Sequence, residues 1–321
     1  MSQHGVSAAS HVAKVQHPRS LAGARLEKRA EMNEQETKKR SRQRAPNNHT
    51  TTGFRISDEL WAILQPLLPV QVNMHRFGGG RPRVTDRRCA DAIFYVLRTG
   101  CQWQALDQTE FCAHSTAHDR FQVWVEAGVF LKLWQAGVKQ FDNLCGIDWD
   151  WLSMDGAMTK APLGGEKTGP NPTDRGKSGV KRSVLTEGHG VPIAVEIVGA
   201  NRHAMKLTRP TIAGIVVDRP EPTAAKPQGM CLDKGYDYQE VRDILHEFGF
   251  TAHIRPRGEE AKAIKREAEF KARRWVVERA HSWMNRFRRL LIRWDKKPAN
   301  YLAFLHFACG LIAFRAARLF G

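Results

Sequence analysis

The spacing of apolar residues changes twice along this 321-residue chain, and these changes constrain the fold more than any other feature. Between residues 57 and 141, apolar side chains recur every three or four positions, which is the spacing of amphipathic helices. Between residues 147 and 257, short apolar stretches of strand length alternate with Gly, Pro and polar residues. From about residue 259 the helical spacing returns. This order predicts an α/β fold with a mixed sheet flanked by helices, preceded by a small all-α region.

Four helices are expected in the first of these regions. The residues expected to cap or stop them are Ser57, Pro69, Asp86, Gly100, Ser115 and Gly128. A fourth helix covers residues 129–141. The helices are short, and the third one begins with polar residues. This pattern matches a helix-turn-helix domain, which places a recognition helix in the DNA major groove. A helical bundle with no role in DNA binding is the alternative.

The middle region is expected to hold several strands and two helices. The expected strands include residues 180–185, 191–198, 229–232 and 251–254, and the expected helices are residues 204–216 and 238–248. The turn at residues 186–190 joins the first two of these strands as a hairpin. The last region is expected to be helical over residues 259–291, with a closing apolar helix over residues 301–320.

Charge and composition narrow the class of protein. The formal net charge is +17 and the pI is about 9.9, which favours a polyanionic partner. No apolar run is expected to be long enough to span a membrane, and the N-terminus lacks the apolar core of a secretory signal. The six cysteines form no CxxC pair, so a reducing cytoplasm fits best. Residues 1–53, with the basic run Lys38–Arg44, are interpreted as a disordered basic tail, or else as an extended or misassigned start.

Three acidic residues are notable because each lies in a basic setting. Asp155 follows a strand-like segment and precedes a glycine, and Asp233 stands in the same relation to a later strand. The carboxyl ends of strands are where such sheets gather their sites. Glu278, from the basic helical region, can add a third carboxylate, and together they can hold two Mg²⁺ ions, or Mn²⁺. Taken singly, each acid is more simply a solvated group, and Glu278 can be an ordinary helix ion pair.

Basic residues predicted to contact DNA fall in the loop 78–83, the third helix, the Gly- and Pro-rich segment 162–182 and the block 273–293. They are Arg81, Arg83, Thr116, His118, Arg120, Lys160, Arg175, Lys177, Lys181, Arg182, Arg274, Arg279, Arg286, Arg289 and Arg293. A plain flexible loop is the alternative for segment 162–182. It contains no phosphate-binding P-loop pattern, so no nucleotide cofactor is indicated.

Taken together, these blocks resemble the transposases of the insertion-sequence-five family, which are DDE transposases with a ribonuclease-H-like catalytic fold. The similarity covers about residues 54–318. In the catalytic part it rests on the motifs Met154–Gly156, Gly164–Lys177, Asp233–Asp237, Arg274–Arg279 and Asn285–Leu290. In the helical part it rests on Ser57–Trp61, Gly80–Arg83 and Leu97–Trp103.

The resemblance implies that Asp155, Asp233 and Glu278 are the catalytic acids and hold the metal ions. This sequence also differs from the family's pattern at several positions. The family's signature places a Tyr and a Lys around the glutamate, where this chain has Lys271 and Asn285. Arg286 can take over the phosphate contact of the missing Lys. The stretch after residue 106 lacks the family's usual proline.

The function implied by the resemblance is a transposase that cleaves DNA at insertion-sequence ends and joins the 3′-hydroxyl ends to target DNA. The domains expected are the tail 1–53, a helical DNA-binding domain 54–146 and a ribonuclease-H-like catalytic domain 147–321. The partners expected are terminal inverted repeats, target DNA and at least one more copy of the chain, in the cytoplasm of a bacterial or archaeal cell. Two rivals are a transposase-derived DNA-binding regulator without cleavage, and a ribonuclease-H-like nuclease acting on RNA–DNA hybrids.

Overall fold

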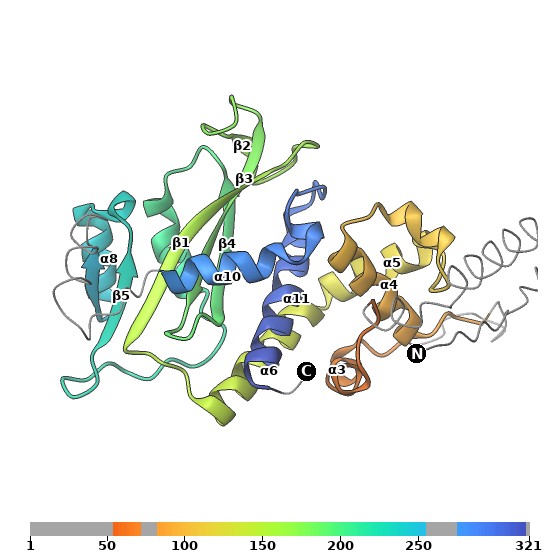
Figure 1. Cartoon of the computed structure of the whole chain (residues 1–321), viewed down its shortest axis with the longest axis horizontal. Coiled ribbons are helices and arrows are strands. Elements are labelled where there is room, and N and C mark those ends of the chain that lie inside the picture. The colour runs from red at the N-terminus through yellow and green to blue at the C-terminus, as the bar shows by residue number, and fades with distance from the viewer. Residues whose placement is uncertain (1–53, 72–81, 255–274, 319–321) are drawn as a thin grey trace, which may run out of the picture. The chain divides into compact units, whose positions relative to one another are not determined.

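The computed structural model describes residues 54–71, 82–254 and 275–318. The C-terminal half of the chain is built around a mixed sheet (Figure 1). Its strands are β1 (Trp151–Lys160), β2 (Gly169–Pro170), β3 (Ser178–Thr186), β4 (Pro192–Gly199), β5 (Gln228–Leu232) and β6 (Phe250–Ile254). β1, β3 and β4 form an antiparallel meander, and short β2 also pairs with β3. β5 lies parallel to β1 on its other side, and β6 lies parallel to β5. Three antiparallel strands joined to two parallel ones make the ribonuclease-H-like arrangement, and the predicted fold class is confirmed.

The hairpin between β3 and β4 forms as predicted, and a buried carboxylate organises its turn. Glu187 is fully buried and accepts hydrogen bonds from the backbone N–H groups of His189 and Val191, at 2.9 and 2.8 Å. A buried acid is stable only when such partners satisfy it. Glu187 therefore has a structural role, at the end of β3 that pairs with Ser153.

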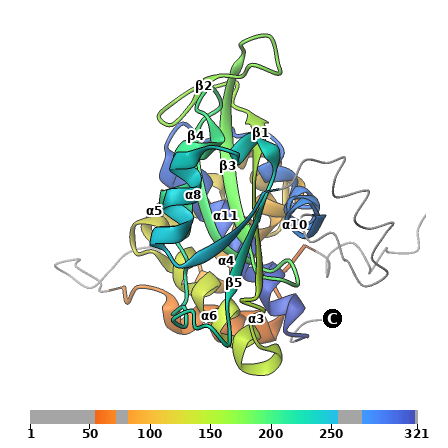
Figure 2. The same cartoon turned by 90° about the vertical axis from the view of Figure 1, so that its left-hand side faces the viewer.

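Among the residues that the structure describes, the helices that cover the sheet are α7 (Thr208–Ala213), α8 (Gln239–Glu247), α10 (Trp275–Asn285) and α11 (Pro298–Ala316). α10 packs against β1 and β3, whereas α8 packs against β6 and α7 against β3 and β4. Figure 2 shows α10 and α8 on opposite sides of the strands. α10 ends at Asn285, and Phe287 has an extended backbone. The predicted helix over residues 259–291 is thus shorter at its C-terminal end, and residues 255–274 lie outside the described part.

The N-terminal region is helical, as predicted. Its elements are α3 (Asp58–Leu64), η1 (Gln65–Leu67), α4 (Asp86–Thr99), η2 (Trp103–Gln108), α5 (His114–Glu126) and α6 (Val129–Cys145). The Ser57 side chain caps α3 by accepting from the Leu60 N–H, and Gly100 ends α4 in the left-handed conformation that glycine favours. Three boundaries differ from expectation. Ala113, not Ser115, is the N-cap residue of α5. Thr85, not Asp86, is the N-cap residue of α4, and α6 runs one turn further than predicted.

The longest apolar helix, α11, packs along α6 and joins the helical region to the sheet. The closest approach is glycine on glycine: a Cβ on Gly137 would lie 3.1 Å from the carbonyl oxygen of Gly310. α11 also contacts β4 and α5. Its 19 residues are apolar enough to cross a bilayer, contrary to the expectation that no such run exists, but 72% of that stretch is buried by the rest of the protein. α11 thus sits as a core helix, within the compact unit Phe54–Gly321.

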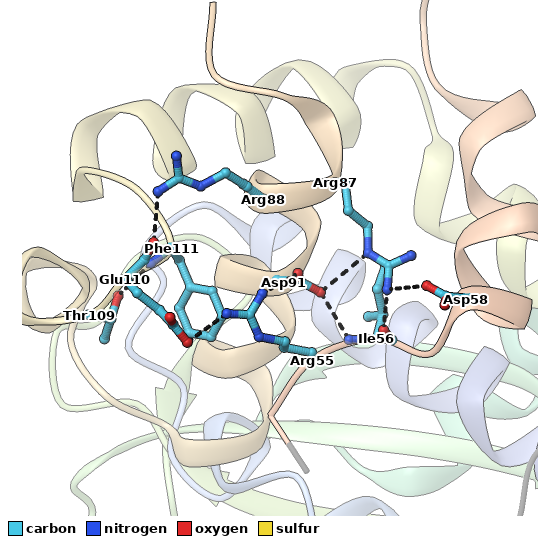
Figure 3. Close-up of polar contacts among 9 residues, drawn as sticks. All are labelled: Arg55, Ile56, Asp58, Arg87, Arg88, Asp91, Thr109, Glu110 and Phe111. Carbon is cyan, nitrogen blue, oxygen red and sulfur yellow. Dashed lines mark hydrogen bonds and ion pairs between the residues drawn. The ribbon is translucent and has the colours of Figure 1, made fainter. Parts of the chain in front are cut away.

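A polar network holds the segment before α3 onto α4 (Figure 3). The buried carboxylate of Asp91 accepts from the Ile56 N–H at 3.0 Å and lies 3.5 Å from the Arg55 guanidinium. Arg55 also pairs with Glu110 at 2.6 Å, and Arg87 donates to the Ile56 carbonyl. Burial raises the pKa of Asp91, and the two arginines and the Ile56 N–H work against that shift. These arginines are neutralised within the protein, so they support the fold of the helical region.

Candidate active site

Asp155 and Asp233 lie on neighbouring parallel strands. Ser153 of β1 is opposite Cys231 of β5, where the pairing between these strands ends. Continuing this register by two residues on each strand brings Asp155 level with Asp233 and on the same face of the sheet, because side chains alternate with a period of two. Asp233 directly follows β5, as predicted. Asp155 was expected at a strand end, but β1 continues to Lys160 because its antiparallel pairing with β3 continues.

Local backbone hydrogen bonds orient both carboxylates. The Oδ1 atom of Asp155 accepts from the Gly156 N–H at 2.7 Å, and that of Asp233 accepts from the Gly235 N–H at 2.8 Å. The second bond caps the 3-10 turn η4 (Lys234–Tyr236). Both aspartates are half-buried. They are therefore held by the backbone while remaining accessible from outside.

The Tyr236 hydroxyl gives independent evidence that the two aspartates approach each other. Tyr236 is buried, and its pKa is raised first by burial and then by the charges of both Asp155 and Asp233. Its oxygen would lie 3.7 Å from a Cβ placed on Gly156. The charges of both carboxylates therefore act on the same neutral hydroxyl group. Sequence reasoning gave Tyr236 no role, although it lies in the Asp233–Asp237 motif.

Glu278 lies in the first turn of α10 and is exposed. Two later residues of the helix fix how it runs along β1. His281 is buried next to the backbone of Asp155, and burial together with the charge of Arg182 lowers its pKa to about 3. Asn285 accepts from the Arg182 side chain at 2.7 Å, and Arg182 is opposite Ala157 in the sheet. Glu278 precedes His281 by one helical turn, so it lies on the part of α10 just before the contact with Asp155.

The donor set suits a hard divalent cation, because all three predicted ligands are carboxylates and none is fully buried. Within the described ranges, no three His, Cys, Asp or Glu side chains are gathered closely enough to hold an ion. Convergence of the three acids on one metal site therefore stays a prediction.

Two of the arginines predicted to contact DNA are buried. Arg293 is 1% exposed, and its guanidinium donates only to backbone carbonyls. They are those of Glu166, Lys167, Asp295 and Lys296, at 2.8, 3.3, 2.8 and 2.9 Å. Arg289 is 4% exposed and pairs with Asp295 at 3.0 Å. Both guanidinium groups are bonded within the protein, so no DNA contact is proposed for them.

Arg182 and Arg120 are also buried, at 2% and 8% exposure. Arg182 donates to Asn285, and Arg120 forms an ion pair with Asp86 of α4. No DNA contact is proposed for these two arginines either. Nothing in the sequence distinguishes them from neighbouring basic residues, because burial of an arginine depends on partners distant along the chain.

Other predicted DNA contacts remain on the surface. Arg83, Lys160, Arg175, Lys177 and Arg286 are exposed. Half-buried residues of the same set are Thr116, His118, Lys181 and Arg279. Arg81 and Arg274 lie outside the described residues, as does Lys271.

The basic segment after β1 has a defined conformation, not that of a plain flexible loop. The buried Asn171 side chain accepts from both the N–H and the hydroxyl of Thr173, at 3.0 and 2.9 Å. Gly165 has a φ of +109°, and a Cβ there would lie 2.4 Å from the carbonyl oxygen of Lys296. Arg293 bonds to the two residues that follow Gly165. The segment is thus clasped to the stretch between α10 and α11.

Two family models match: one described as a transposase of the IS4/5 family (DUF4096), over residues 56–134, and one described as a transposase DDE domain, over residues 145–312. A Burkholderia cepacia protein named as a transposase for insertion sequence element IS402 is 36% identical over 161 residues. That match covers 48% of this chain and 72% of the relative. A second protein of the same element and organism, of 16.2 kDa, is 30% identical over 36% of this chain and 80% of its own length.

Among solved structures, the catalytic domain of Mos1 mariner transposase matches with a TM-score of 0.25 and 10% identity, over 59% of this chain and 91% of that one. The Mos1 mariner paired-end complex with Mn matches with a TM-score of 0.25 and 11% identity, over 78% and 83%. Similarity this low defines neither a site nor a ligand.

The mixed sheet and its flanking helices define a ribonuclease-H-like α/β protein. The matches over both parts of the chain go further: it belongs to the DDE transposases of the insertion-sequence IS4/5 family.

Proposed function

We propose that this transposase cleaves DNA at the ends of its insertion sequence and joins the resulting 3′-hydroxyl groups to target DNA. Asp155, Asp233 and Glu278 are the proposed catalytic acids. The observation that supports this most strongly is that the register of β1 and β5 brings Asp155 level with Asp233, the residue directly after β5. The charges of both aspartates also raise the pKa of Tyr236. Glu278 joins them from α10, which packs on β1.

The proposed metal ligands are these three carboxylates, with Mg²⁺ or Mn²⁺ as the ion. Bound divalent cations lower the pKa of water and stabilise the charge on attacking and leaving oxygens. The protein's part is to fix the carboxylates, which it does through the Gly156 and Gly235 N–H groups. In the reaction, water displaces the 3′-oxygen at the element end. The freed 3′-hydroxyl then displaces a 3′-oxygen in the target, and one phosphodiester bond forms as another breaks.

Exposed cations at the end of β1 and in the segment after it support DNA as the substrate. Lys160 continues β1 beyond Asp155, and Arg175 and Lys177 follow in the clasped segment. Such residues neutralise phosphates without selecting sequence. Preference for the element's own ends is assigned to the helical region. Because two ends must be joined, we propose that the active form contains at least two copies of the chain, acting on DNA in the cytoplasm.

The experiment compares three substrates: a duplex carrying the inverted repeat that flanks the gene, a scrambled duplex and an RNA–DNA hybrid. The full chain with Mg²⁺ should nick the first at the repeat boundary and leave the other two intact. Cleavage of the hybrid alone would instead favour the nuclease. Binding to the repeat without any cleavage would favour the regulator.

Variants with the acids neutralised one at a time, Asp155→Asn, Asp233→Asn and Glu278→Gln, should lose cleavage by orders of magnitude while still binding the repeat. Asp243→Asn is the matched control, because this exposed carboxylate on α8 hydrogen-bonds only to Gln239 among the described residues. It should cleave at the wild-type rate. Equal losses in the control and the acid variants would remove the argument for this site.

A further inference from the structure

A hollow of about 240 Å³ lies where the end of α10 meets the last turns of α11. Its lining residues are Trp283, Arg286, Phe287, Ile312, Arg315 and Ala316. The lining is mostly apolar, and it includes the side chains of two arginines, Arg286 and Arg315. Both Arg286 and Arg315 are exposed. The hollow lies at the opposite end of α10 from Glu278.

A third arginine adds to this pair from the helical region. Arg98, in the last turn of α4, has its guanidinium carbon 5.4 Å from the centre of the Phe287 ring, which is part of the hollow's wall. The pKa of Arg315 is lowered first by partial burial and then by the charges of Arg98 and Arg286. Arg98 and Arg286 are therefore close enough to Arg315 to disfavour its charged form. We call Arg98, Arg286 and Arg315 the arginine triad.

The arginine triad has no paired carboxylate among the described residues, whereas other arginines do. Across residues 54–71, 82–254 and 275–318, no carboxylate pairs with any of its three members. By contrast, Arg209 is paired with Glu247 at 2.5 Å and Arg242 with Asp237 at 2.6 Å. Like charges gathered without a counter-ion destabilise a fold, and an anion would relieve that repulsion.

The chemistry of the triad selects a phosphate. Guanidinium groups present planar forks of donors that match phosphate oxygens, and they are less strongly hydrated than ammonium groups. An apolar floor formed by Phe287 and Ile312 lowers the local dielectric and strengthens such contacts.

We propose that the arginine triad binds a backbone phosphate of the DNA on which this transposase acts, a partner that rests on the proposed function. Arg286 follows Glu278 by eight residues, which is about 12 Å along a helix. That length corresponds to the rise of roughly three to four base pairs of duplex. One duplex can therefore reach both places. The triad would hold the strand a few base pairs from the phosphate that is cleaved.

The test is DNA binding by the full chain in EDTA, over a range of KCl concentrations. The variant Arg286→Gln/Arg315→Gln should weaken binding to any duplex and reduce the salt slope by about 0.9, because one phosphate contact is lost. The control Arg209→Gln/Arg242→Gln removes the same net charge from arginines that are already paired. Its salt slope should match that of the wild type.

Thermal unfolding without DNA separates a binding site from a structural one. Removing two mutually repelling charges should leave the Tm of the triad variant unchanged or raise it. A salt slope equal to that of the control, or weaker binding together with a lower Tm, would overturn the proposal. Because EDTA excludes cleavage, the result is independent of catalysis. A wild type that binds with the predicted slope but never cleaves would instead defeat the proposed function and leave the triad standing.

Discussion

Arg293→Lys distinguishes an arginine that holds the fold from one that contacts DNA. The substitution keeps the charge, so long-range attraction to DNA is unchanged. The Arg293 guanidinium reaches four backbone carbonyls through three nitrogens. A lysine has one nitrogen and cannot span them, so at least two carbonyls lose their donor.

The cost follows from these contacts. A buried acceptor left without a donor costs about 1–3 kcal/mol, so two of them cost roughly 2–6 kcal/mol of unfolding free energy. For a chain of this size that corresponds to a drop in Tm of roughly 5–20 °C. The carbonyls of Glu166 and Lys167 belong to the clasped segment, so cleavage should fall as well because the segment loosens beside β1.

The assay is thermal unfolding of Arg293→Lys beside the control Arg242→Lys, which changes one exposed arginine with a single ion pair. The control should stay within about 0.5 kcal/mol of the wild type. An unchanged Tm for Arg293→Lys would refute the structural role.

Three further predictions concern packing and pH. Gly165→Ala should lower the Tm and reduce cleavage, because its φ of +109° is strained for alanine and the new Cβ would meet the Lys296 carbonyl at 2.4 Å; an unchanged Tm would show that the clasp is looser than described. Ser57→Ala should cost about 1 kcal/mol in urea unfolding, because the cap of α3 is lost, and a Ser57→Asp variant should recover it. His306 packs on Trp134 and its pKa is lowered to about 4 by burial, so the folded ring is neutral while the unfolded ring takes up a proton below about 6.5. Its contribution to stability is therefore present above pH 6.5 and lost as pH falls toward 4, and His306→Gln should flatten that loss in urea titrations; curves that stay parallel to those of the wild type would contradict it.

Much of the fold follows from the sequence because its signals are local. The cap at Ser57, the left-handed Gly100 and the hairpin before β4 each depend on residues a few positions apart. Asp233 follows its strand as predicted for the same reason. Asp155 was misplaced by the glycine after it, since Gly156 lies inside β1 and is held there by pairing with Ser183.

The features that sequence reasoning missed depend on distant contacts. Arg293 resembles its basic neighbours, yet its partner Glu166 is 127 residues away in the chain. Tyr236 and His281 gained their places beside Asp155 only when β5 and α10 packed on β1. One signal was available: His281 lies one helical turn from Glu278, on a spacing that brings both toward the same strand.

The central claim is that Asp155 and Asp233 serve one site, and a double-mutant comparison of cleavage tests it most directly. Single-turnover cleavage of the element-end duplex would be measured for Asp155→Asn, Asp233→Asn and the variant carrying both. Residues that act as a unit are strongly non-additive, so the double variant should be no slower than the slower single variant. If each change instead cost a modest factor and the two factors multiplied, the aspartates would act independently and the one-site account would be wrong.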